Sequence, residues 1–242
     1  MNQQQHIHLL RVQLLAMSRL SQRALDYSIT GYEIRNLDFS RHVPTSQCAL
    51  EEHHSRIKEL CRELMNDGIA KPADSRFAFA AFTIAAALHV TYAAAVQIAQ
   101  DTVRLTESGI HQAASLERMG QIVNGSMRLC IVALFQQDAE HAETALRHQE
   151  SLRLLEPPSI APQEELEQAV ARSLVEVAKQ THEIADAIIF WLEGKSCVAA
   201  SGSDKHISVE LPPTRRRQHA AALSYLQPKR TPGPKITQSL SC

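Results

Sequence analysis

The sequence is poor in the residues that build β-sheets and enzyme loops. Glycine occupies only 8 of 242 positions, and aromatic residues make up 5% of the chain. Runs of β-branched residues between glycine-rich turns are missing, while helix-favouring Ala, Leu, Gln, Glu and Arg are abundant. We therefore predict an all-α protein. The Gly-x-Ser-x-Gly motif, a phosphate-binding glycine loop and a dinucleotide fingerprint are also missing, so we expect no enzyme and no catalytic residue.

The cysteines lack the spacing of a zinc site or of a disulfide framework. They are odd in number, contain no CxxC pair, and lie at Cys48, Cys61, Cys130, Cys197 and Cys242. This pattern is typical of a reducing compartment. The opening segment MNQQQHIHLLRVQLL has no basic start, apolar run or small-residue cleavage site of a secretory signal. We therefore expect a cytoplasmic protein.

Charge is missing from one long segment. The stretch from Phe77 to Gln100 contains no Asp, Glu, Lys or Arg, and as a helix it would be about 36 Å long, enough to cross a bilayer. One set of positions instead follows the alternating steps of four and three that mark a bundle seam: Phe77, Ala81, Ile84, Leu88, Thr91, Ala95 and Ile98. The stretch contains ten alanines, most of them on the other faces, and His89 and Gln97 are unfavourable in hydrocarbon. We predict a central bundle helix and no membrane span.

Hydrophobic periodicity predicts five helices and a tail. The helices are expected over about 6–40, 46–66, 72–108, 110–155 and 162–194. Weak similarity between the two halves suggests two helical repeats, residues 1–108 and 109–201, the second shortened where a middle helix would recur, around 151–163.

The segment 202–242 differs in composition from the rest. It carries seven Lys or Arg against two Asp or Glu, and five of the ten prolines. We interpret it as a basic, proline-rich disordered tail. Its run Arg215–Arg217 could contact an acidic partner, a nucleic acid or a membrane surface, but such runs are usually solvated, and no nucleic-acid partner is expected.

Three passages resemble the PhoU family of phosphate-uptake regulators. LEEHHSRIKELCREL (Leu50–Leu64) is similar to the family's short second helix. KPADSRFAFAAFTIAAALHVTYAAAVQIAQ (Lys71–Gln100) is similar to its long third helix. LERMGQIVNGSMRLCIVALFQQDAEHAETAL (Leu116–Leu146) resembles the opening of its second repeat. The resemblance covers roughly residues 9–195.

The resemblance implies a fold of two tandem antiparallel three-helix bundles. It implies a cytoplasmic, non-enzymatic adaptor that contacts the ATPase of a phosphate ABC transporter and a membrane histidine kinase, with a homodimer possible. Asp74 and Arg76 match the family's D-x-R near the start of the third helix. They are the candidate partner-contact residues.

Departures from the family pattern concern metal binding. Family members usually carry an acidic E-x-x-x-D pair on the third helix of each repeat, which binds metal clusters. The matching positions here are His89 and Ala93 in the first repeat, and Val175 and Lys179 in the second. An imidazole with a methyl group, or a valine with a lysine, cannot replace two carboxylates. We therefore expect no metal and no cofactor.

Two alternatives stay open. A diverged bundle could have kept the fold and acquired another partner. A metal-binding bundle enzyme would need two Glu-x-x-His motifs on facing helices. The sequence has one, Glu51 with His54, and an acidic counterpart, Asp138 with His141. His89, in an otherwise apolar helix, is expected to be a hydrogen-bonded core residue.

The composition of the tail gives a testable prediction. Truncation before Gly202 should leave the melting temperature within experimental error, because too few tail residues are apolar to offset the entropy of ordering them. Differential scanning calorimetry of the full-length and truncated proteins measures this. A drop of several degrees would show that the tail packs on the bundle.

Overall fold

The computed structural model describes residues 3–66, 71–109, 114–154 and 165–194, and this part of the chain is all-α. The predicted tail lies outside the described residues. The elements are α1 (Gln3–Ile34), α2 (Leu37–His42), the 3₁₀ turn η1 (Val43–Ser46), α3 (Gln47–Asn66), α4 (Pro72–Glu107), α5 (Ala114–Gln136), α6 (Ala139–Glu150), the 3₁₀ turn η2 (Ser151–Leu154) and α7 (Glu165–Glu193).

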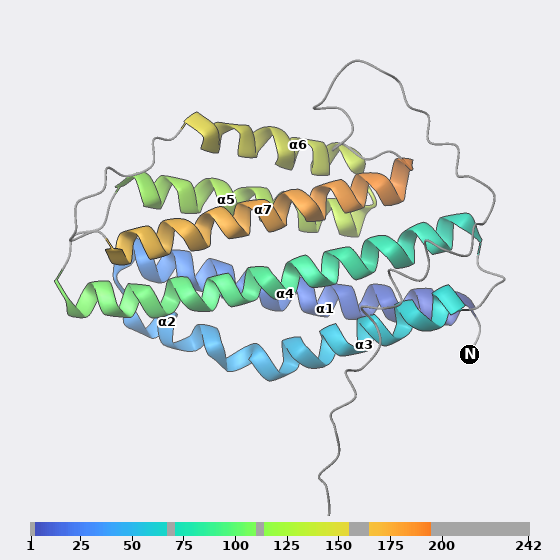
Figure 1. Ribbon diagram of the computed structural model, residues 1–242, viewed down its shortest axis with the longest axis horizontal. Helices are drawn as coiled ribbons and strands as arrows, with labels where there is room; N and C mark the ends of the chain where they lie inside the picture. The colour runs from blue at the N-terminus through green and yellow to red at the C-terminus, as the bar shows by residue number, and fades with distance from the viewer. Residues whose placement is uncertain (1–2, 67–70, 110–113, 155–164, 195–242) are drawn as a thin grey trace, which may run out of the picture. The chain divides into compact units, whose positions relative to one another are not determined.

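The helices form two groups of three that share a four-helix centre. Helices α1, α3 and α4 contact one another, as do α5, α6 and α7. The groups meet where α4 packs along α7 and α1 packs along α5, so α3 and α6 lie on the outer sides (Figure 1). Helices α4 and α7 run antiparallel (Figure 1), and Phe77 near the start of α4 packs against Trp191 near the end of α7.

Helix α4 is the core helix that the sequence predicted. All seven positions of the predicted seam are at most 3% exposed. The flanking alanines Ala78, Ala80, Ala85, Ala87 and Ala99 are equally buried. The helix is long and apolar enough to cross a membrane by length and composition. Its contacts with α1, α3 and α7 account for much of that composition, because these helices cover most of its apolar side chains, although Phe79 is 52% exposed.

The predicted helix 6–40 is broken in the structure. Arg35 adopts a left-handed backbone conformation, φ 51°, and ends α1. Asn36 then begins α2 as its N-cap, its side chain accepting a hydrogen bond from the backbone N–H of Asp38 at 2.9 Å. Asparagine is among the best N-cap residues, which explains why the chain restarts here.

The predicted helix 110–155 is broken in the same way. Gln137 has φ 54°, and Asp138 caps α6 by accepting from the backbone N–H of Glu140 at 2.9 Å. The prediction of one continuous helix was therefore wrong. The 12-residue α6 packs on both α5 and α7, as the 20-residue α3 packs on α1 and α4, so a short middle helix is present at 139–150.

A polar network joins α1 to α5 across the centre. One carboxylate oxygen of Asp26 accepts hydrogen bonds from Asn124 (2.8 Å) and Arg128 (2.7 Å) of α5, and from Gln22 (3.1 Å) of its own helix. Nearby, Gly120 lets α5 approach closely, because a Cβ there would lie 3.2 Å from Ile29 of α1. Hydrogen bonds between polar side chains of two helices help to fix the register of those helices.

The burial of α4 leads to a prediction for Leu88, which is 1% exposed and whose carbonyl oxygen accepts a hydrogen bond from Ser21 of α1 at 3.0 Å. Leu88→Asp should destabilise the protein by several kcal/mol, comparable with the whole stability of a domain, because an unpaired carboxylate would be buried. Chemical denaturation measures this, and Glu140→Ala at an exposed position is the control. A soluble Leu88→Asp protein with unchanged helicity and melting temperature would contradict the packing described.

Candidate functional site

The first turn of α4 holds the two candidate partner-contact residues. The helix begins with Lys71 as N-cap in an extended conformation and Pro72 at the first helical position, where the missing N–H of proline costs little. Asp74 lies in the first turn and is not the N-cap residue, since Lys71 holds that position without a side-chain capping bond. The half-buried Asp74 carboxylate instead accepts a hydrogen bond from Gln3 Nε2 of α1 at 3.1 Å.

Arg76 lies two residues further and points elsewhere, because residues at i and i+2 do not share a helix face. Within the described residues no ion pair joins it to Asp74. Its side chain is half-buried, and its Nε atom is buried with no hydrogen-bond partner in the described part of the chain. The structure therefore does not bring the two predicted residues together as a pair. Both lie at the same end of the bundle, but each has its own surroundings.

A second inter-helix contact supports the same end of the bundle. His6 Nε2 of α1 lies 2.8 Å from a carboxylate oxygen of Glu63 near the end of α3. We call the residues Gln3, His6, Glu63, Asp74 and Arg76 the α4-start surface. It presents donors, acceptors and charges of both signs on three packed helices.

Of the four positions that match the family's two acidic pairs, the first, His89, has an unexpected neighbour. His89 of α4 was expected to be a hydrogen-bonded core residue, but it is half-buried. Its ring stacks on His54 of α3, with centroids 4.7 Å apart and an interplanar angle of 27°. The pKa of His54 is lowered to about 4, mainly by burial and also by the nearby His89 and Lys58, against the opposing effect of Glu51. The two stacked rings join α3 to α4.

The other three positions face solvent. Ala93 is exposed at the margin of α4, and Val175 (56% exposed) and Lys179 lie on the outer face of α7. Ala93 lines a shallow groove of about 410 Å³ between the two helices, together with Val90, Ala94, Gln97, Asp101, Ala169, Arg172, Ser173 and Glu176. No group of three or more His, Cys, Asp or Glu side chains that could hold a metal ion occurs among the described residues.

The two halves of the hypothetical di-metal centre lie far apart in the fold. Glu51 and His54 are on α3, while Asp138 and His141 begin α6, and these two outer helices do not contact each other. Asp138 is a helix cap: the N–H of Glu140, and then the His141 ring nitrogen at 2.8 Å, hold the pKa of its carboxyl below the usual value. The motif that resembled half of a metal site is therefore a helix-start structure.

Comparison with solved structures identifies the fold. The protein is similar to the crystal structure of PhoU from Pseudomonas aeruginosa, with a TM-score of 0.67 and 17% sequence identity over 80% of this chain and 100% of that chain. It is similar to the phosphate transport system regulatory protein PhoU from Streptococcus pneumoniae, with a TM-score of 0.67 and 15% identity over 81% of this chain and 99% of that one.

No protein-family model matches the sequence, and no curated protein sequence matches it either. At identities of 15–17%, the structural likeness establishes the fold. The protein has a PhoU-like all-α fold, and the fold class expected from the sequence is confirmed.

The stacked histidines give a pH prediction. The pKa of His54 is 6.5 in the unfolded chain and about 4 in the folded protein, so the folded protein binds this proton only at lower pH. The unfolded state therefore binds more protons in this window, and stability should fall as the pH drops from about 6.5 to about 4. Because His54 is only half-buried, solvent screening reduces the effect, and we expect about 1 kcal/mol from this residue.

Urea denaturation of wild-type and His54→Gln proteins at pH 7.0 and 4.5 measures the contribution. The variant should lose about 1 kcal/mol less stability between the two pH values than the wild type. His182→Gln, at an exposed histidine of α7, is the control and should follow the wild-type profile. Identical losses in wild type and His54→Gln would show that His54 titrates as it does in the unfolded chain.

Proposed function

We propose that this protein regulates phosphate uptake and phosphate-starvation signalling, acting in the cytoplasm by contact with other proteins rather than by catalysis. The observation that supports the proposal is the likeness of fold to two PhoU structures over 99–100% of their chains. One of these structures is described as a phosphate transport system regulatory protein. The likeness therefore extends over the whole helical part of a regulator and is not limited to one shared helix pair.

The partners we propose are the ATPase of a phosphate ABC transporter and a membrane histidine kinase. Binding to one or both would damp starvation signalling when phosphate is plentiful. The α4-start surface is the proposed contact region, because its charges of both signs come from three rigid helices. A polar surface held by packed helices gives specificity through electrostatic complementarity without a catalytic residue.

We also propose that regulation proceeds without metal clusters at the positions matching the acidic pairs. The ring of His89 stacks on His54. Of the other three positions, Ala93 and Val175 have no metal-binding atom, and the only side-chain nitrogen belongs to the cation Lys179. Hard or iron-type cations need several carboxylate ligands, which these positions do not provide. If this chain retains the regulator's role, it does so through protein surfaces.

Gene deletion tests the proposed function directly. Deletion should raise phosphate-starvation gene expression in high phosphate, and a plasmid copy should restore repression. Reporter expression and phosphate uptake are measured in both high and low phosphate. If both quantities are unchanged in the deletion strain, the regulator proposal fails and the diverged interaction protein takes its place. Co-purification with mass spectrometry then identifies the partner.

Arg76→Glu tests the contact surface. The reversed charge should abolish repression in high phosphate and weaken partner binding at least tenfold, because a rim charge opposed by its partner becomes repulsive. Arg62→Glu is the matched control, since it makes the same charge change at an exposed position of the neighbouring α3. Because Arg76 is half-buried, melting temperatures of both variants are measured first, and Arg76→Gln provides a neutral version. Full repression by a folded Arg76→Glu protein would exclude this surface.

A further inference from the structure

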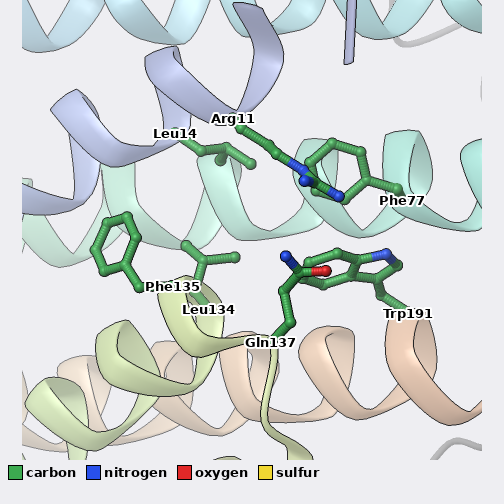
Figure 2. A pocket seen from close by; sticks show the side chains of 7 residues that line it. All are labelled: Arg11, Leu14, Phe77, Leu134, Phe135, Gln137 and Trp191. Carbon is green, nitrogen blue, oxygen red and sulfur yellow. The ribbon is translucent and has the colours of Figure 1, made fainter. Parts of the chain in front are cut away.

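A small pocket opens where the two groups of helices meet, beside the first turns of α4. It has a volume of about 70 Å³ and is lined by Arg11, Leu14, Phe77, Leu134, Phe135, Gln137 and Trp191 (Figure 2). These residues come from α1, α4, α5, the α5–α6 break and α7. By comparison, a single water molecule needs about 10–15 Å³. The pocket can therefore accept a group of several non-hydrogen atoms.

The cation at the pocket is held in place by two aromatic rings. The guanidinium carbon of Arg11 lies 5.3 Å from the centroid of Phe77 and 5.9 Å from that of Trp191, and the two rings are 4.8 Å apart. Figure 2 shows Arg11 reaching from α1 across the Phe77 ring. Within the described part of the chain, no carboxylate forms an ion pair with Arg11, although its side chain is ordered by stacking. A cation fixed in this way loses little freedom when it binds an anion.

The rest of the pocket has an apolar floor and a second hydrogen-bond donor, Gln137. Leu14, Phe77, Leu134 and Trp191 are each at most 8% exposed, so the floor is apolar. The side chain of Gln137 lines the pocket beside Trp191, and it comes from the left-handed turn that separates α5 from α6 (Figure 2). No Asp or Glu lines the pocket. The lining therefore favours a ligand that is anionic at one end and apolar at the other.

We propose that this pocket binds a carboxylate attached to a short apolar group. The carboxylate would accept paired hydrogen bonds from the Arg11 guanidinium and one from the Gln137 amide, and the apolar group would rest on Leu14, Leu134 and the aromatic pair. Arginine suits this task because its planar fork matches a carboxylate with two parallel hydrogen bonds. The carboxylate belongs either to a free small acid or to the C-terminal end of a protein chain.

A purely structural role for Arg11 explains less of the geometry. Arginine often covers apolar surface with its stem, and Arg11 would then simply shield Phe77 and Trp191 from water. That role requires neither a cavity beside the guanidinium nor an amide from a left-handed turn in its lining. A test must therefore separate ligand binding from shielding.

The single tryptophan of the chain is in the pocket, so Trp191 reports binding directly. Full-length protein is titrated with butyrate, butyramide, acetate and inorganic phosphate, and the indole N–H resonance and the fluorescence of Trp191 are followed. Butyrate should give a saturable change. Butyramide lacks the charge, acetate lacks most of the apolar group, and phosphate cannot occupy the floor, so each should bind at least tenfold more weakly.

Variants assign the charge to Arg11. Arg11→Gln should weaken butyrate binding at least tenfold, and Arg19→Gln, which removes the same charge from an exposed position of α1, should bind as the wild type does. If Arg11→Gln does not fold, Arg11→Lys replaces it. Lysine keeps the charge but lacks the planar fork, so binding should still weaken.

Two peptides distinguish the sources of the carboxylate. A pentapeptide ending in Leu with a free carboxylate is compared with the same peptide amidated at its C-terminus. Tighter binding of the free-carboxylate peptide than of butyrate assigns the pocket to a chain end, and weaker binding assigns it to a free acid. The proposal is overturned if no carboxylate gives a saturable change at Trp191, if butyrate and butyramide bind equally, or if folded Arg11→Gln binds as the wild type does.

Discussion

The close approach of α1, α3 and α7 to α4 sets the spacing of the whole bundle. Alanines on α4 remove the side-chain bulk that would hold the other helices away, and side chains of neighbouring helices then reach its backbone. Ser21 of α1 donates to the carbonyl oxygen of Leu88, and Cys61 of α3 donates to that of Ala78 at 3.3 Å. These small donors satisfy additional backbone acceptors at the points of closest contact. A larger residue at either position would separate the helices and weaken the four-helix centre.

The central helix was predictable because its periodicity is long and uninterrupted, so burial of Leu88 or Ile98 follows from counting residues. The helix breaks were missed because each depends on one residue in a left-handed conformation, Arg35 or Gln137, within otherwise periodic sequence. The signal that could have found them is the polar cap that follows, Asn36 or Asp138. Asp138 was instead assigned to a metal motif, since a cap and a ligand use the same carboxylate.

The sites were less predictable than the fold, because they join residues that are distant in sequence. Stacking of His54 on His89, and of Arg11 over Phe77 and Trp191, depends on which faces of four helices meet. Periodicity places each residue on a face but does not say which other helix that face contacts. Asp74 and Arg76 were found through a local motif, and a local motif shows only that two residues are near one another along the chain.

The extensive interface between α4 and α7 also affects a chain that is still being synthesised. Helix α4 is complete at Glu107, but α7, which covers one of its faces, ends only at Glu193. At about 5–20 residues per second, that face remains uncovered for roughly ten seconds. During this interval Phe77 has no Trp191 to stack on, and apolar surface that later joins the two helix groups is accessible to other nascent chains. Chaperone demand should therefore be greatest before the last helix emerges from the ribosome.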